Sequence, residues 1–300
     1  MVSALIWFLN VVLGDEFVLM CGMFFFVGLI EYCFPAKKIP RRHYAFNLGY
    51  AFLNIFVVST LTPILSVGAA YTIQNIGFGF IDLRALGFGA VSGSLFAVLI
   101  GTFIWDFFQY WQHRLEHRSK VFWQMHLLHH CDEHMNVTTA SRHHIFENFL
   151  APVFVTVPTA ILFQVPPVTI ATLALIPYAW LYLSHANINL GFGPFWWLLV
   201  SPNYHRVHHS LTAEHIDKNF ANWFPIWDII FGTACIPQWR ECPSTGVAGV
   251  CVQTLPQAFL LPFKGWSGMI SRRVAGSPPQ HPVAASDADG SIVVETTPHA

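Results

Sequence analysis

Apolar residues form four long runs along this 300-residue chain, at residues 16–34, 45–71, 94–112 and 149–184. Each of the first three can form a helix of about 20 residues, the length that crosses the ~30 Å hydrocarbon core of a bilayer. Val165, Pro166 and Pro167 interrupt the fourth run. Because proline cannot continue a helix interior, the fourth run predicts two helices joined as a hairpin.

Composition supports a membrane protein. Hydrophobic residues make up 54% of the chain and charged residues 10%, whereas ordinary soluble domains carry about 25% charged residues. The sequence therefore predicts an all-α integral membrane protein with about four transmembrane helices, or three and a helical hairpin. The formal net charge of −1 argues against nucleic acid as a partner.

The patterns divide the chain into three regions. Residues 1–94 are predicted to hold the N-terminal membrane helices, and residues 95–270 hold the remaining helices and most of the histidines. Residues 271–300 are rich in Ser, Pro, Ala and Asp, a composition that predicts a disordered tail.

Basic residues predict the orientation of the chain in the bilayer. A loop with Lys37, Lys38, Arg41 and Arg42 follows the first apolar run, and the positive-inside rule places such a loop in the cytoplasm. Counting the predicted spans from this loop brings the polar block 113–147 and the later histidines to the same side. We therefore expect a multi-pass protein with a histidine-rich helical cap, and its active site, on the cytoplasmic face.

Histidine carries the candidate chemistry. The pattern His-x-x-His-His occurs twice, at His126, His129 and His130 and again at His205, His208 and His209. With 16 histidines in the chain, chance gives one such triplet only about 0.05 times. Imidazole is the commonest metal ligand in proteins. The two triplets therefore predict a metal site.

The number of imidazoles predicts two metal ions. His113 and His117 precede the first triplet with a spacing of four, which places both on one helix face. Together with the triplets they give eight imidazoles, whereas a single zinc takes about four ligands. Eight neutral nitrogen ligands instead favour two metals, each with a position open for oxygen or water.

Further polar residues are candidates for the same site. His185 lies where the predicted hairpin returns to the cytoplasmic side, and both it and His144 are expected as additional ligands. Asp106 follows the helix stripe of His113; it either fixes the tautomer of a ligand or is satisfied by a neighbouring helix. Three other histidines are expected at the surface or beside the ligands: His134, His143 and His215.

These motifs resemble the histidine boxes of the fatty acid hydroxylase superfamily, which includes the sterol desaturases. The segment from His113 to His117 is similar to the first box, and the two triplets are similar to the second and last boxes. Residues 135–147, Asn219 and residues 227–233 resemble the segments that follow those boxes. The resemblance covers residues 95–235 and marks 95–270 as the catalytic domain.

The resemblance implies a helical membrane enzyme whose histidine-ligated di-iron centre uses O₂ to attack an unactivated C–H bond. Some members carry histidine at the position of Asn189 and proline at that of Ile145, so this chain departs from the pattern twice. The catalytic residues implied are His113, His117, His126, His129, His130, His205, His208 and His209, and the metal ligands implied are these eight with His144 and His185.

The implied cofactors are two iron ions, with O₂ as co-substrate and an apolar lipid as substrate. The sequence has no Gly-x-Gly-x-x-Gly motif after a strand, so a separate reductase, ferredoxin or cytochrome is expected to supply electrons. Sterol, fatty acyl, ether lipid and carotenoid substrates fit the motifs equally, as do hydroxylation and desaturation. The alternative is a non-enzymatic multi-histidine membrane metal protein, a transporter or a scaffold, although transporters usually bind their ions at the membrane midplane.

Overall fold

The computed structural model describes residues 14–82, 90–163, 178–238, 241–274, 285–286 and 292–293, and it is mainly helical. The long helices are α2 (Asp15–Cys33), α3 (Arg41–Asn75), α4 (Ala90–Arg118) and α10 (Leu255–Val274). The shorter α-helices are α5 (Lys120–His130), α6 (Val157–Leu162), α8 (Pro202–His208) and α9 (Ile226–Ile230).

Short helical turns connect these helices. They are η2 (Val137–Ser141), η3 (Glu147–Phe149), the π-helical η4 (Pro152–Thr156), η5 (Gly193–Phe195) and η6 (Ala213–His215). Two strands, β1 (Ala285–Ser286) and β2 (Ile292–Val293), pair antiparallel with Ala285 opposite Val293.

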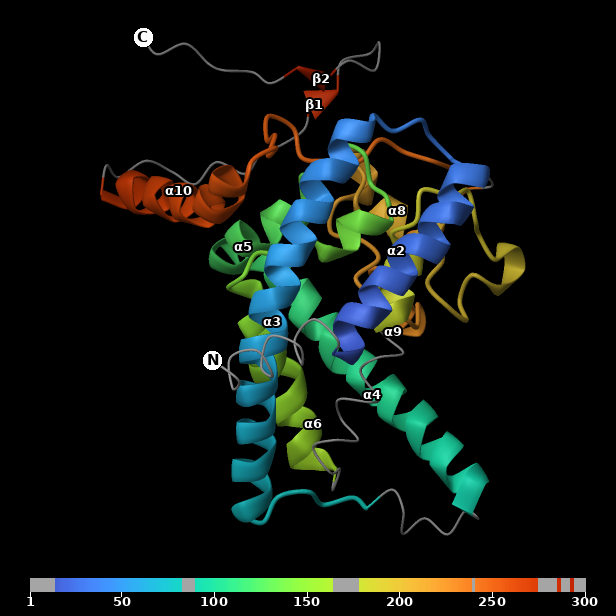
Figure 1. Cartoon of the computed structure of the whole chain (residues 1–300), viewed down its shortest axis with the longest axis vertical. Helices are drawn as coiled ribbons and strands as arrows, with labels where there is room; N and C mark the ends of the chain where they lie inside the picture. The colour runs from blue at the N-terminus through green and yellow to red at the C-terminus, as the bar shows by residue number, and fades with distance from the viewer. Residues whose placement is uncertain are drawn as a thin grey trace, which may run out of the picture.

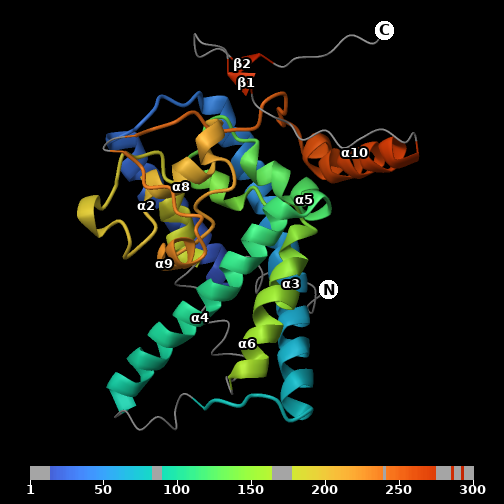
Figure 2. The same cartoon turned by 180° about the vertical axis from the view of Figure 1, so that it is seen from behind.

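The helices form a wide upper part and long lower extensions (Figure 1). Helices α3, α4 and α6 extend downwards, while the segments with α5, α8 and α9 gather around the upper ends of α3 and α4. Figure 2 shows the same arrangement from behind, with α10 projecting sideways next to α5. The histidine-bearing segments therefore lie at one end of the long helices.

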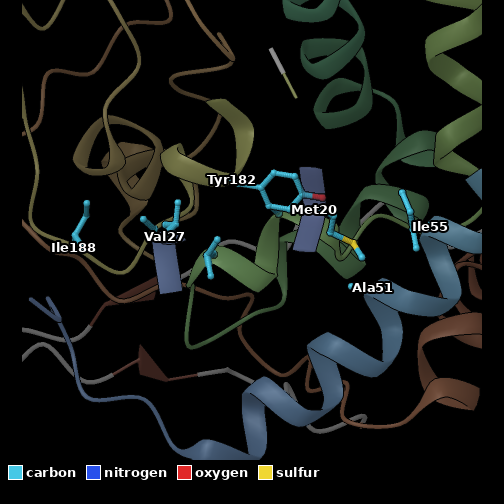
Figure 3. Packing of buried hydrophobic residues seen from close by; sticks show 9 residues of the cluster. Met20, Val27, Ala51, Ile55, Tyr182 and Ile188 are labelled. Carbon is cyan, nitrogen blue, oxygen red and sulfur yellow. The ribbon is translucent and has the colours of Figure 1, made fainter. Parts of the chain in front are cut away.

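A hydrophobic cluster joins α2 and α3 to this end of the molecule (Figure 3). Met20 of α2 faces Ala51 and Ile55 of α3, and Tyr182 packs on the same group. All four are almost completely buried, and full burial of one large apolar side chain contributes about 1.5–3 kcal/mol. The cluster thus fixes α2 and α3 against the turn η2 and the segment that leads to His185.

The prediction of transmembrane helices is wrong. Among the described residues, none of the helices combines the length and the apolar character that crossing a membrane requires. Polar residues inside the apolar runs make internal contacts instead: buried Glu31 accepts hydrogen bonds from the backbone N–H groups of Val137 (2.7 Å) and Asn187 (2.6 Å). In α3, buried Asn47 donates to Asp132 (3.0 Å).

The predicted membrane topology is wrong for the same reason as the predicted transmembrane helices. The multi-pass arrangement and the cytoplasmic placement of the active site both depended on counting four spans, and the described helices do not supply them. The described residues are mainly helical, as expected, but they also include the strand pair β1–β2. The predicted hairpin turn at residues 165–167 and most of the predicted tail lie outside the described residues, and α4 runs continuously across the boundary drawn at residue 94.

Candidate metal centre

A one-residue break between α4 and α5 brings the first two histidine motifs together. Helix α4 ends at Arg118 and α5 begins at Lys120, with Ser119 between them as the N-cap. The Ser119 hydroxyl accepts from the backbone N–H of Phe122 (3.4 Å), which is the usual role of serine at a helix start. His117 in the last turn of α4 thus lies next to His130 in the last turn of α5, with 3.1 Å between their Nε2 atoms.

Helix α8 carries the second triplet in a similar way. Ser201 caps its first turn by accepting from the N–H of Tyr204 (3.2 Å), and Pro202 occupies the first helical position, where proline is well tolerated. The helix is seven residues long, so its histidines again fall in the last turn and at the C-cap.

Nine histidines form two groups in which the ligating nitrogens lie within 4.8 Å of one another. The first group is His113, His117, His126, His130 and His208, and the second is His129, His185, His205 and His209. Neighbouring Nε2 atoms within a group are 3.0–3.2 Å apart. Two nitrogens that bind the same ion at ~2.1 Å cannot be more than about 4.2 Å apart, so these separations are short enough for shared ligation.

Hydrogen bonds from Nδ1 set the tautomers in the first group. His113 Nδ1 lies 2.7 Å from the carbonyl oxygen of Phe220, and His208 Nδ1 lies 2.7 Å from that of Lys218. A carbonyl only accepts, so in both rings Nδ1 carries the proton and Nε2 presents a lone pair. His126 Nδ1 likewise donates to the carboxylate of Glu147 (2.8 Å).

The lone pairs that face each other need a cation between them. His113 Nε2 and His126 Nε2 are 3.1 Å apart, yet with both protons on Nδ1 neither nitrogen can donate to the other. In the second group, His185 Nδ1 donates to the carbonyl of Leu181 (2.7 Å) and its Nε2 faces that of His129 at 3.1 Å. The hydrogen bond to Leu181 fixes the tautomer of His185 in the second group as well. In both groups, unprotonated nitrogens that point toward one another are suited to binding a metal ion.

Burial keeps the imidazoles uncharged. Loss of solvent lowers the pKa of His185 and of His208 to about 3, with neighbouring histidines adding to the effect. Burial first, and then the charge of neighbouring histidines, lowers six further pKa values well below the ordinary value: those of His113, His117, His129, His130, His205 and His209. Neutral imidazole is the form that binds a metal.

Two buried carboxylates border the first group. Glu147 accepts from Nδ1 of both His126 (2.8 Å) and His143 (2.6 Å) through the same oxygen. Burial acts to raise the pKa of Glu147, but these histidines hold it below its usual value. Burial and the charge of Glu147 raise the pKa of Glu116 well above its usual range. Of these two carboxyl groups, Glu147 is thus the ionised one, and it orients the ring of His126.

The structure brings nine of the ten predicted ligands together and leaves one apart. His144 accepts from the N–H of Phe146 (3.2 Å), and its Nε2 contacts the carbonyl oxygen of Phe259 (3.2 Å) on α10. Its neighbour His143 lies at the site instead, stacked on His129 with ring centroids 4.2 Å apart. The sequence signal for His143 is Glu147, four residues later.

The other polar candidates have separate roles. Asp106 accepts from the backbone N–H groups of Trp223 (3.0 Å) and Phe224 (2.8 Å). Asp106 is therefore satisfied within the protein, although by the segment that precedes α9 and not by a neighbouring helix as the alternative supposed. His134 packs its ring against His43, and His215 contacts Ser210 (3.0 Å), so neither belongs to the two groups.

Asp228 organises the backbone carbonyls that hold the first group. It is fully buried and accepts from the N–H groups of Phe220 (2.8 Å) and Ala221 (3.0 Å) and from the hydroxyl of Tyr204 (3.0 Å). Asn219, in the left-handed region at φ 58°, turns the chain so that the carbonyls on either side reach the two rings. The resemblance to the family included Asn219 and Asp228 but implied no role for either residue.

Replacement of Asp228 by alanine is expected to lower the free energy of unfolding by about 3–5 kcal/mol, because several buried donors lose their acceptor at about 1–3 kcal/mol each. The Phe220 carbonyl is then less fixed, so zinc affinity should also fall. Urea unfolding and zinc titration measure the two effects. Asp228→Asn, which keeps the shape and one oxygen, should lose less of both; a fully stable alanine variant would contradict this role.

The fold and the two imidazole groups define a buried site that could bind metal ions in a helical domain. Residues 98–233, which contain every one of the nine histidines, match the family model described as fatty acid hydroxylase. This match covers less than half of the chain and shows that its histidine-bearing part is similar to fatty acid hydroxylases.

Known proteins with related sequences act on lipids. Alkylglycerol monooxygenase of Xenopus tropicalis is 35% identical over 128 residues, which are 43% of this chain and 28% of that protein. The Homo sapiens alkylglycerol monooxygenase is 34% identical over the same shares. Ornithine lipid hydroxylase OlsE of Rhizobium tropici is 27% identical over 180 residues, 59% of this chain and 54% of that protein. The chain thus spans under a third of the alkylglycerol monooxygenases. No solved structure gives a significant match.

Proposed function

We propose that this chain is an O₂-dependent non-haem iron enzyme that hydroxylates a lipid. Two irons are held by the two groups defined above, with His144 outside both. The observation that carries the proposal is the convergence of Nε2 lone pairs at 3.0–3.2 Å in a buried, uncharged site. When bound, the iron pair supplies the redox chemistry that reduces O₂ and oxidises an aliphatic C–H bond.

The chain itself orients and isolates the centre. The carbonyls of Lys218, Phe220 and Leu181 hold three rings in one tautomer, so the ligands need little reorganisation on binding. Neutral imidazoles do not cancel the metal charge, which favours binding of reduced oxygen species. Eight of the nine rings are buried, which limits access of water that otherwise competes for oxidising equivalents.

The reaction is R–H + O₂ + 2e⁻ + 2H⁺ → R–OH + H₂O, in which one oxygen atom enters the lipid and the other is reduced to water. The two electrons come from a separate donor protein or small reductant, because the sequence shows no dinucleotide-binding motif. Insertion of oxygen is favoured over desaturation because the relatives are named as a monooxygenase and a hydroxylase.

Isotope-labelled O₂ tests the proposal. The full chain, reconstituted with Fe(II) and supplied with a chemical reductant, is expected to transfer one labelled oxygen to a 1-O-alkylglycerol or an ornithine lipid, as measured by mass spectrometry. Zinc-loaded protein is the control and should give no product, since zinc has no redox chemistry. Iron-loaded protein that labels neither lipid class would contradict the proposal.

A further inference from the structure

A cavity of about 60 Å³ lies between α2, α3 and η2, on the side of the centre where the long helices converge. Its apolar wall consists of Met20 from α2, Ala51, Ile55 and Val58 from α3, and Ala140 from η2. Figure 3 shows three of these residues, Met20, Ala51 and Ile55, next to one another. The cavity therefore opens between the two helices that lie outside the matched hydroxylase region.

The inner wall of the cavity reaches the second histidine group. His143 lines the cavity and stacks on His129, with ring centroids 4.2 Å apart and planes inclined by only 17°. Only the thickness of one imidazole thus separates this side of the cavity from a residue assigned as a metal ligand. Tyr178, on the helical segment that leads to His185, lines another side.

The polar side chains in the wall are already paired with other protein groups. Asn54 donates to the carbonyl oxygens of Ser141 (3.3 Å) and His143 (3.1 Å), and its own oxygen accepts from Asn148 (2.9 Å). The Ser141 hydroxyl contacts the hydroxyl of Tyr182 (3.3 Å). A methylene group can therefore enter the cavity without breaking a hydrogen bond. A polar ligand would lose its hydration and find few free hydrogen-bonding groups in the wall to replace it.

The contact between α2 and α3 also has apolar side chains beyond those that line the cavity. Phe17 of α2 packs on Phe52 of α3 across the same seam, with ring centroids 5.8 Å apart. Phe52 is 46% exposed, and the next residue, Leu53, is 41% exposed. Apolar side chains thus continue from the cavity wall on α3 to exposed positions of the same helix.

The geometry points to this cavity as the site that receives a short segment of the alkyl chain of the lipid substrate. This inference rests on the proposed function and extends it to a substrate class: lipids with an unbranched alkyl chain. The cavity volume of about 60 Å³ is several times the ~10–15 Å³ that a single water molecule needs in a protein interior. It therefore holds a few methylene groups, and the polar headgroup lies elsewhere.

Binding to zinc-loaded full-length protein tests the inference without any turnover. The probe is 1-O-hexadecylglycerol, and its Kd is measured by calorimetry below the concentration at which it forms micelles. Ala51→Leu fills the cavity and is expected to raise the Kd by about tenfold or more. Ala160→Leu, at an equally buried alanine of α6 outside the cavity, is the matched control and should leave the Kd unchanged.

A second variant enlarges the space, in case Ala51→Leu does not fold. Ile55→Ala is expected to tighten binding of a methyl-branched hexadecyl probe relative to the straight one. Zinc content and the thermal midpoint of each variant verify that the site and the fold are intact. Unchanged Kd values in both Ala51→Leu and Ile55→Ala, with normal zinc content, would overturn the inference. Failure of the proposed function would differ, since labelled oxygen would then be missing from products while cavity variants still altered binding.

Discussion

Alanine at His208 is expected to remove the metal from the first group and to reduce lipid hydroxylation by at least ~100-fold, a loss that even partners of metal ligands can cause. His208 contributes a nitrogen 3.1 Å from that of His130 and is the one ligand of this group that comes from α8. The metal content should therefore fall from about two ions per chain to about one. His129→Ala should do the same to the second group.

His144→Ala is the matched control for these variants. It removes another buried histidine of the same region, but one that binds Phe146 and Phe259 instead of the two groups. We expect it to keep both metals and most of the activity. Metal analysis and product formation in all three variants measure the effect. Full activity in His208→Ala and His129→Ala, or loss of one metal in His144→Ala, would refute the assignment of ligands.

Acid is expected to unfold the metal-free chain over a narrow range of pH. Burial lowers the pKa of eight histidines, to about 3 for His185 and His208, whereas in the unfolded chain histidine titrates near ~6.5. Above ~6.5 both states are neutral and these residues do not alter stability with pH. Below it the unfolded chain binds protons that the folded site excludes, so stability falls as pH decreases.

The size of the effect follows from the number of histidines. Each contributes about 1.4 kcal/mol per pH unit in this range, so eight of them exhaust a total stability of about 5–15 kcal/mol within about two units. Circular dichroism should show unfolding between about pH 4.5 and 6 without metal. Zinc-loaded protein should unfold at lower pH, because metal binds only the folded site. A metal-free chain that stays folded at pH 4 would contradict the lowered pKa values.

The sequence predicted the site better than it predicted the fold. Spacing alone identified eight of the nine grouped histidines, because metal geometry requires ligands at fixed helical intervals. Spacing did not show that His143 stacks on His129 while His144 points to α10, since adjacent residues differ only in the direction they face. That direction is set by distant contacts, such as the one between His144 and Phe259 on α10.

The membrane spans were the larger error. Hydropathy averages a segment and does not show which polar residue inside it has a partner elsewhere. Glu31 and Asn47 interrupt apolar runs, and both bind the segment between the two triplets. The role of Asp228 could not be predicted from the sequence either. It acts through the backbone of a neighbouring segment, and backbone groups are the same in every residue.

The two histidine groups differ in how far apart their members lie along the chain, and this sets an order of assembly. Four ligands of the first group lie between residues 113 and 130, on two consecutive helices, whereas the second group draws on His129, His185 and the triplet that ends at His209. Closing long loops costs more chain entropy than closing short ones. During synthesis these four ligands can thus come together before α8 has been translated, whereas only His129 of the second group is available at that stage. Both sites are completed by the same late helix, because α8 and its C-cap bring His208 to the first group and His205 and His209 to the second.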